Sequence, residues 1–330
     1  MSFPYYTGNP HNRRQDKPAD LPGSRRARQT DPAGYLPDDG LVDAVNVALL
    51  LGQPLLLTGE PGTGKTQLAY SLAWELGFDA PLIFETKSTS TARDLFYGYD
   101  TLGRFHAAQT GDGSSAGLDY LTWHALGIAI LQSHPKTAEI ERWLPDGFQH
   151  NGPRRSVVLI DEIDKAPRDF PNDLLNEVEN QYFRVPELGN ARIAANEEMR
   201  PILVLTSNSE KNLPDAFLRR CVYYNIPFPN RRRLTEIVIG RVGSFENSDS
   251  PLLADSLDLF FKLREPGGGL RKRPATAELI GWLIALNEIG VKADQSLKQN
   301  GEAALRTLST LIKSADDQET AKKIVENWLK

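Results

Sequence analysis

One run of eight residues has the composition and spacing of a phosphate-binding loop. It reads GEPGTGKT and satisfies the pattern G-x-x-x-x-G-K-[ST]. Its glycines let backbone N–H groups turn inward around phosphate oxygens, with no Cβ in the way. Lys65 can reach the β- and γ-phosphates of a nucleotide, and the Thr66 hydroxyl can ligate Mg²⁺. The predicted nucleotide-binding residues of this loop are Gly59, Glu60, Pro61, Gly62, Thr63, Gly64, Lys65 and Thr66.

The residues on either side of the loop supply the context that this motif requires. Pro54 to Thr58 is a short apolar run typical of a buried parallel strand. From Lys65 onward, apolar residues recur at helical spacing as far as Gly77. A helix that begins at the loop directs its N-terminal N–H groups and positive dipole end toward a bound anion. A strand before and a helix after favour a nucleotide site over a chance glycine-rich turn.

A pair of carboxylates supplies the second half of the predicted site. Asp161 and Glu162 follow the apolar run Val157–Ile160, so they lie at the carboxyl end of a predicted buried strand, where open α/β sheets bind ligands. Asp161 is expected to hold Mg²⁺ through its water shell, and Glu162 to orient and polarise the attacking water. Two acids after an apolar run are often only a solvated strand end. Together with the loop, they predict nucleotide hydrolysis.

The hydrophobic pattern predicts an α/β fold with a doubly wound parallel sheet. A helix is expected from Asp38 or Asp39 to Leu51, a loop over 111–115, another helix over 120–132, and a hairpin over 183–193. Five apolar runs are the expected strands of the sheet: 54–58, 82–84, 157–160, 202–205 and 222–226.

Three regions are predicted along the chain. Residues 1–34 are rich in Pro, Gly, Arg and Asp and are expected to form a flexible basic arm. Residues 35–229 form the α/β core, with inserts near 98–150 and 183–193. Residues 230–330 are expected to form a separate helical domain. Its predicted helices span 232–242, 252–264, 274–289, 301–314 and 317–329.

Composition narrows the classes of function. The net charge of -5 and pI near 5.7 argue against a general nucleic-acid binder. The basic residues between Arg13 and Arg28 keep that class open, although a solvated linker is the preferred interpretation. Cys221 is the sole cysteine, which excludes an intrachain disulfide. The chain shows no secretory signal and no run long enough to span a membrane, so a cytoplasmic protein is expected.

With these motifs in place, the chain resembles the AAA+ ATPases, and more narrowly their MoxR-type and dynein-related branch. The resemblance runs from about Tyr35 to the end, and it rests on GEPGTGKT and on LIDEID over 159–164. It implies a P-loop NTPase fold with a C-terminal helical lid domain, and hydrolysis of ATP with Mg²⁺ at subunit interfaces. It further implies a homo-oligomeric ring, with a hexamer expected, and a protein client, often one with a von Willebrand factor A domain.

The same resemblance assigns roles to polar residues outside the two motifs. Asn208 corresponds to the residue that contacts the γ-phosphate or the attacking water. Arg220 corresponds to the arginine that a neighbouring subunit inserts against the γ-phosphate, with Arg219 as the alternate. Arg273 is the nearest candidate for the arginine of the lid domain, although the family often places it where this chain has Ala275 and Thr276.

The two inserts and the function class leave alternatives. The inserts resemble segments that line the axial face of the ring and touch a client, but the aromatic cluster around Tyr97 and Phe105 is as readily explained as local core. Three classes of function remain: a chaperone-like ATPase that remodels a protein partner, a slow nucleotide-gated switch or scaffold, and a nucleic-acid translocase or restriction-type motor. ATP is the expected nucleotide, and GTP stays open.

Overall fold

The chain forms two compact units in the computed structural model. The structure describes residues 31–110, 117–144, 148, 150–209 and 213–330. The first unit, here called the sheet unit, consists of residues 37–60 and 64–227. The second, the helical unit, consists of residues 61–63 and 228–330 with the described residues before Pro37. The predicted loop over 111–115 and most of the predicted arm lie outside the described residues.

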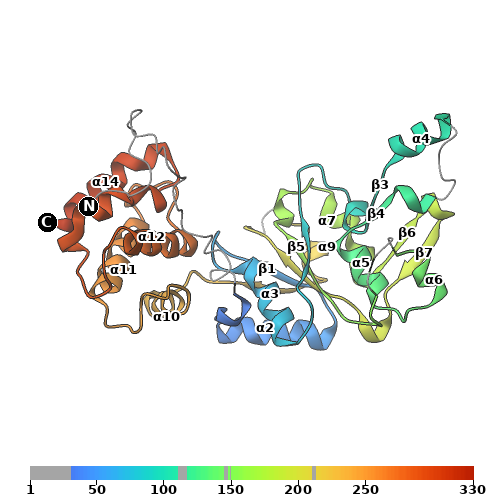
Figure 1. The fold of residues 1–330 in the computed structure, drawn as a ribbon, viewed down its shortest axis with the longest axis horizontal. Coiled ribbons are helices and arrows are strands. Elements are labelled where there is room, and N and C mark those ends of the chain that lie inside the picture. Colours follow the sequence, from blue (N-terminus) through green and yellow to red (C-terminus); the bar gives the residue numbers. More distant parts are fainter. Residues whose placement is uncertain (1–30, 111–116, 145–147, 149, 210–212) are drawn as a thin grey trace, which may run out of the picture. The chain divides into compact units, whose positions relative to one another are not determined.

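A five-stranded parallel sheet is the centre of the sheet unit (Figure 1). The strand order β2-β5-β8-β1-β9 is that of a doubly wound fold, which confirms the predicted fold class. All residues of β1 and the first four of β5 are buried. Both faces of the sheet are therefore covered, which explains why these strands are continuous apolar runs. The strands are β1 (Leu55–Thr58), β2 (Leu82–Glu85), β5 (Val157–Asp161), β8 (Ile202–Thr206) and β9 (Val222–Asn225).

The helices of this unit begin and end at residues that the sequence marks. The helix α2 (Asp39–Leu51) starts after Asp38, whose carboxylate accepts the Leu41 N–H at 2.9 Å, and stops at Gly52 in the left-handed conformation. α3 (Lys65–Glu75) follows the phosphate-binding loop. The other helices are α4 (Thr101–Thr110), α5 (Ala125–Gln132), α6 (Ala138–Glu141), α7 (Phe170–Asp173), α8 (Leu175–Asn180) and α9 (Asp215–Leu218).

The helix predicted over 120–132 is wrong in its first part. Leu121–Trp123 instead forms the strand β4, which pairs antiparallel with β3 (Tyr97–Tyr99), and helix α5 begins only at Ala125. The Trp123 ring packs edge-on against Tyr97 and Phe183, with ring centroids 6.1 Å and 5.7 Å apart. Aromatic packing between segments distant in sequence overrides the helical spacing of the apolar residues.

The predicted hairpin over 183–193 is confirmed. β6 (Tyr182–Val185) pairs antiparallel with β7 (Ala191–Ala194). The aromatic residues in and beside the first insert differ in burial. Phe96 and Tyr97 are buried in the core of the sheet unit, whereas Phe105 on α4 is 58% exposed.

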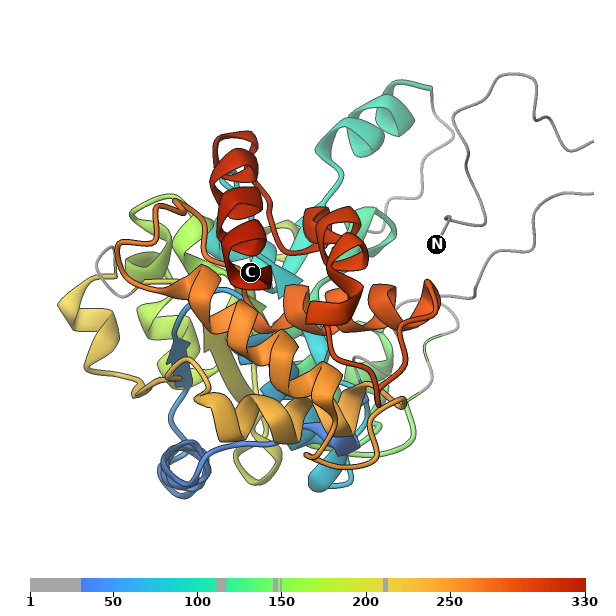
Figure 2. The same cartoon turned by 90° about the vertical axis from the view of Figure 1, so that its left-hand side faces the viewer.

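The helical unit contains five α-helices among its described residues (Figures 1 and 2). Four of them lie where helices are predicted, but the predicted helix over 301–314 is interrupted after Arg306. Thr307 is buried there, donates its hydroxyl proton to the Ala303 carbonyl at 2.7 Å and accepts the indole N–H of Trp282 at 2.8 Å. Such a side-chain bond to the helix backbone competes with regular helix. The helices are α10 (Arg231–Arg241), α11 (Pro251–Arg264), α12 (Thr276–Glu288), α13 (Gly301–Arg306) and α14 (Ala315–Leu329).

Short 3₁₀ segments connect many of these elements. The 3₁₀ segments are η1 (Pro32–Gly34), η2 (Ala92–Leu95), η3 (Gly117–Tyr120), η4 (Ile163–Lys165), η5 (Pro186–Leu188), η6 (Glu197–Met199), η7 (Lys298–Asn300) and η8 (Leu308–Thr310).

None of the described helices is both long enough and apolar enough to cross a membrane.

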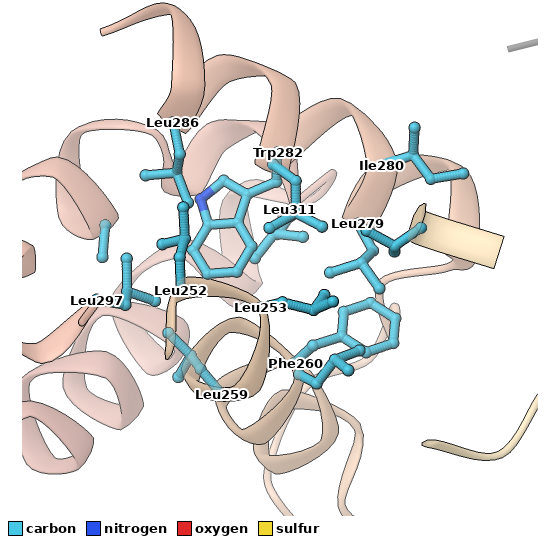
Figure 3. Close-up of a cluster of buried hydrophobic side chains, with 14 of the residues drawn as sticks. Leu252, Leu253, Leu259, Phe260, Leu279, Ile280, Trp282, Leu286, Leu297 and Leu311 are labelled. Atoms are coloured by element: carbon cyan, nitrogen blue, oxygen red, sulfur yellow. The ribbon is translucent and has the colours of Figure 1, made fainter. Parts of the chain in front are cut away.

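Each unit has its own hydrophobic core, and Trp282 is the largest fully buried side chain of the helical unit. Its indole ring lies among Leu252, Leu286 and Leu311, which come from α11, α12 and the segment before α14 (Figure 3). One side chain therefore joins helices that are separated in sequence.

Replacing Trp282 by Ala is expected to destabilise the helical unit by about 3–5 kcal/mol, because a large cavity forms and the Thr307 hydroxyl loses its donor. Trp74→Ala is the matched control, since Trp74 is 58% exposed on α3 and its loss should cost less than about 1 kcal/mol. Chemical denaturation followed by circular dichroism measures both. Equal losses in the two variants would contradict this account of the core.

Candidate nucleotide-binding site

Three neighbouring strands place the predicted site residues at one edge of the sheet. The loop leaves β1, the acidic pair ends β5, and Asn208 follows β8, and these strands are adjacent in the order β5-β8-β1. Because the three strands are parallel, their carboxyl ends lie at the same edge. The sheet thus brings together side chains that are far apart in sequence.

The phosphate-binding loop depends on backbone conformations that favour glycine. Gly59, Gly62 and Gly64 have φ values of 141°, 78° and 91°, which L-residues with a Cβ rarely adopt. Gly64 is the N-cap of α3, and no side chain of the described residues caps that end of the helix. The first N–H groups of α3 therefore point toward the loop. An anion bound there would accept hydrogen bonds from them and would also be stabilised by the helix dipole.

Lys65 is the central cation of the site and is only 8% exposed. Its ammonium group donates to the carbonyls of Gly59 and Glu60 at 2.8 Å and 3.1 Å, and to Asn208 Oδ1 at 3.2 Å. Burial lowers the pKa of Lys65, and the nearby carboxylates of Asp164, Asp161 and Glu162 oppose that change. The structure thus brings the predicted phosphate-binding lysine and the predicted γ-phosphate contact together.

Thr66 and Asp161 form a pair of hard oxygen donors. The Thr66 hydroxyl donates to Asp161 Oδ1 at 3.0 Å, which joins the start of α3 to the end of β5. Hydroxyl and carboxylate oxygens are ligands that Mg²⁺ accepts, and this ion usually completes its shell with waters and substrate phosphates. The two side chains therefore fit the predicted metal. The described residues contain no group of three or more His, Cys, Asp or Glu side chains suited to a metal.

Glu162 has an unusual backbone conformation for a residue other than glycine. Its φ of 55° and ψ of 51° are left-handed, and it precedes η4. Its N–H donates to the Thr206 hydroxyl at 2.9 Å, and its half-exposed carboxylate forms an ion pair with Lys165. The hydrogen bond from the Lys165 ammonium to the Glu162 carboxylate raises the pKa of Lys165. The turn presents the Glu162 carboxylate to solvent, directly after Asp161.

Two residues of the site have no role in the sequence prediction. The Thr206 hydroxyl donates to Asp161 Oδ1 at 2.5 Å. Asp164 accepts the backbone N–H of Asn208 at 3.2 Å and its side-chain N–H at 3.5 Å. A polar residue at the end of an apolar strand, and a third acid after the Asp161–Glu162 pair, were the signals that could have identified them.

The predicted arginines lie in different surroundings. Arg220 follows α9 and forms an ion pair with Glu179 Oε2 at 2.9 Å, while it also donates to the Ala216 carbonyl. Arg219 ends α9 and is exposed. Arg273 is exposed in the segment before α12 of the helical unit. The contacts of Arg220 are thus with its own unit, and its side chain remains 43% exposed.

Comparison with known proteins finds distant relatives. The chain is 25% identical to the uncharacterised protein YehL of Escherichia coli K12 over 194 residues. This alignment covers 57% of this chain and 45% of that relative. The match therefore spans less than half the length of the curated relative. Among solved structures, a mutant of Thermotoga maritima RuvB is similar over 86% of this chain and 72% of its own, with 19% identity and a TM-score of 0.47. The RuvB Holliday junction branch migration motor of the same organism is 19% identical over 84% of this chain and 69% of its own, with a TM-score of 0.44.

A family model gives the assignment. The model of the AAA domain, dynein-related subfamily, matches residues 54–221, slightly more than half of the chain. The matched range includes the loop that begins at Gly59, the acidic pair that begins at Asp161, Asn208 and both arginines after α9. On this match, and on the parallel sheet that carries the site, the chain belongs to the dynein-related subfamily of the AAA domain family.

Proposed function

We propose that the chain is an ATPase that binds ATP with Mg²⁺ at the sheet edge and hydrolyses it to ADP and phosphate. The observation that carries this proposal is the convergence of Lys65, Asp161 and Asn208 from three neighbouring strands. Asn208 Oδ1 lies 3.2 Å from the Lys65 ammonium, and the Asp161 carboxylate accepts the Thr66 hydroxyl. A cation, a metal-binding pair and a polar contact are the parts that phosphoryl transfer to water requires.

Each residue has a separate task in binding. The loop N–H groups and Lys65 would receive the phosphates, and Lys65 would exchange its two carbonyl contacts for phosphate oxygens. Thr66 and Asp161 would hold Mg²⁺, which neutralises charge on the phosphates when bound. Asp164 holds Asn208 through two hydrogen bonds, so that its amide is oriented before nucleotide binds.

Glu162 would accept a proton from the attacking water. The water oxygen forms a bond to the γ-phosphorus, the bond from that phosphorus to the β–γ bridging oxygen breaks, and ADP leaves with the electron pair. In the structure the Glu162 carboxylate is paired with Lys165. Hydrolysis therefore requires the carboxylate to exchange this partner for the water.

Arg220 is proposed to act on the nucleotide of a neighbouring copy in a homo-oligomeric ring, with Arg219 as the alternate and a hexamer as the expected size. Its 43% exposed side chain supports this role, because a group that acts between subunits must be accessible at the surface. The ion pair with Glu179 would hold the guanidinium in place until the neighbour docks. Arg273 is proposed as the lid arginine of the same site.

The proposed client is a protein, and the proposed role is MoxR-like remodelling in the cytoplasm, with a partner that contains a von Willebrand factor A domain. Helix α4 supports a protein-binding role, since Leu102 and Phe105 are 72% and 58% exposed on it. The second candidate is a slow nucleotide-gated switch. The ion pair of Glu162 with Lys165 favours this candidate, because it competes with the attacking water for the carboxylate.

Lys65→Ala is expected to abolish nucleotide binding, because the loop loses the buried cation that offsets phosphate charge. Titration with a fluorescent ATP analogue measures the affinity. Lys136→Ala is the control, since Lys136 is an exposed lysine of the same unit that pairs with Glu141. Retained tight binding in Lys65→Ala would remove the loop from its assigned role.

Glu162→Gln is expected to bind ATP as the unmodified chain does but to hydrolyse it at least about a hundredfold more slowly, because an amide accepts no proton. Steady-state phosphate release and the same fluorescence titration check the two halves of this expectation. Unchanged turnover would exclude Glu162 as the general base.

The specific activity of the unmodified chain is expected to rise with protein concentration, and Arg220→Ala is expected to abolish hydrolysis. Both expectations follow because the arginine completes the site of a neighbouring copy. Phosphate release from ATP and from GTP over a dilution series measures this. Glu179→Ala is the matched control: it breaks the same ion pair and retains the arginine, so most activity should remain.

An equal loss of hydrolysis in Arg220→Ala and Glu179→Ala would mean that Arg220 acts only through its ion pair with Glu179, as a structural contact, and not on the site of a neighbour. Mixing Arg220→Ala with Lys65→Ala subunits is expected to restore part of the activity, since some mixed interfaces are intact. Activity independent of concentration would exclude a site shared between subunits.

A further inference from the structure

The hydroxyl of Thr206 lies between the two acidic residues of the site. Thr206 ends β8 and is fully buried. Its Oγ1 donates to Asp161 Oδ1 at 2.5 Å and accepts the N–H of Glu162 at 2.9 Å. A single side-chain atom therefore contacts both the carboxylate expected to hold the metal and the backbone of the residue expected to activate water.

The direction of these bonds follows from the chemistry of a hydroxyl group. It has one proton to donate and lone pairs to accept. The donor–acceptor distance of 2.5 Å to Asp161 is in the range of a charge-assisted bond to a carboxylate, so the proton points to that oxygen. The lone pairs then face the Glu162 N–H, and polarisation by the first bond strengthens the second. The two bonds support each other.

The second bond holds a backbone conformation that is costly by itself. A left-handed conformation is unfavourable for a residue with a Cβ, and contacts with neighbouring groups must offset its cost. Glu162 has φ 55°, and the residues on either side of it are Asp161 in β5 and the buried Ile163. The Thr206 hydroxyl is the acceptor that satisfies the Glu162 N–H in this turn.

We propose that Thr206 is a positioning residue that orients the Asp161 carboxylate for Mg²⁺ and holds Glu162 in its left-handed turn. This inference rests on the proposed function. Thr206 touches neither nucleotide nor metal in this role, and it acts through the two acidic residues. It also links β8, which leads to Asn208, to the end of β5, where Asp161 and Glu162 lie.

A second buried threonine differs in what its hydroxyl contacts. The hydroxyl of Thr307 in the helical unit donates to the Ala303 carbonyl of the preceding helix at 2.7 Å and accepts the indole N–H of Trp282 at 2.8 Å. Thr206 instead donates to a carboxylate from another strand. Thr307→Val is therefore the matched control, since it removes a buried hydroxyl that both donates and accepts a hydrogen bond but leaves the sheet edge unchanged.

The experiment compares Thr206→Val, Thr206→Ser and Thr307→Val in the full chain. Affinity for a fluorescent ATP analogue is measured first in excess EDTA and then during a Mg²⁺ titration, and ATP hydrolysis is measured over the same titration. Thr206→Val is expected to bind the analogue normally in EDTA, to need about tenfold more Mg²⁺ for half-maximal effect, and to hydrolyse slowly even at saturating Mg²⁺. Thr206→Ser keeps the hydroxyl and should restore both quantities.

Thermal unfolding separates a positioning role from a loss of fold. Both valine variants should unfold at lower temperature than the unmodified chain, but only Thr206→Val should change the Mg²⁺ requirement. An unchanged Mg²⁺ requirement in Thr206→Val, or a serine variant as impaired as the valine variant, would overturn the inference. If Thr206→Val does not fold, a serine variant with altered Mg²⁺ dependence overturns it alone. An unmodified chain that binds no nucleotide would instead overturn the proposed function, and this inference with it.

Discussion

The parallel hydrogen bonding of β5, β8 and β1 is the constraint on which the site depends. In the observed register Ile160 lies beside Leu205, and Leu57 lies beside Thr206. The next residue on β5 is Asp161, and the residue after Thr58 begins the phosphate-binding loop. A shift of one residue along any of these strands would turn each side chain to the opposite face of the sheet. Such a shift is unfavourable because it would displace the polar residues at the carboxyl ends of these buried, otherwise apolar strands.

Electrostatics then decides how the polar groups at this edge pair. Lys65 is buried, and its ammonium is stabilised by loop carbonyls, by Asn208 and by the field of three carboxylates. The Asp161 carboxylate accepts hydrogen bonds from the hydroxyls of Thr66 and Thr206. Buried charges require such partners, because each unpaired one would be costly. The network that stabilises these charges is the same one that would receive phosphate and Mg²⁺, so stability and function draw on the same contacts.

The helical unit is built on a different principle. Its core is held by apolar contact around Trp282, whose indole N–H donates to the Thr307 hydroxyl. Asp317 at the start of α14 accepts the N–H groups of Arg271 and Lys272, which lowers the pKa of its carboxyl group and orders the segment before α12. Each unit has its own hydrophobic core, and the residues of the candidate site other than Pro61–Thr63 and Arg273 belong to the sheet unit.

The sequence by itself determined the local features. The glycines of the GEPGTGKT loop predict a backbone that turns around an anion, and Asp38 and Gly52 predict the ends of α2. Apolar runs predict the five parallel strands. Each of these signals depends on near neighbours in the chain. Together with the acidic pair after β5, they were enough to predict the fold class and to place the loop and Asp161 in one site.

Only the tertiary structure decided which distant groups pair. The strand at Leu121–Trp123 forms because Trp123 packs against Phe183. The helix that begins at Gly301 stops after Arg306, where the Thr307 hydroxyl donates to the Ala303 carbonyl and accepts the Trp282 N–H. The hydroxyl of Thr206 between Asp161 and Glu162, and the ion pair of Arg220 with Glu179, likewise depend on strand register and turn geometry. Sequence periodicity reports which face of an element is apolar. It does not report which polar atom of another element lies within about 3 Å, because that distance is set by the packing of the whole unit.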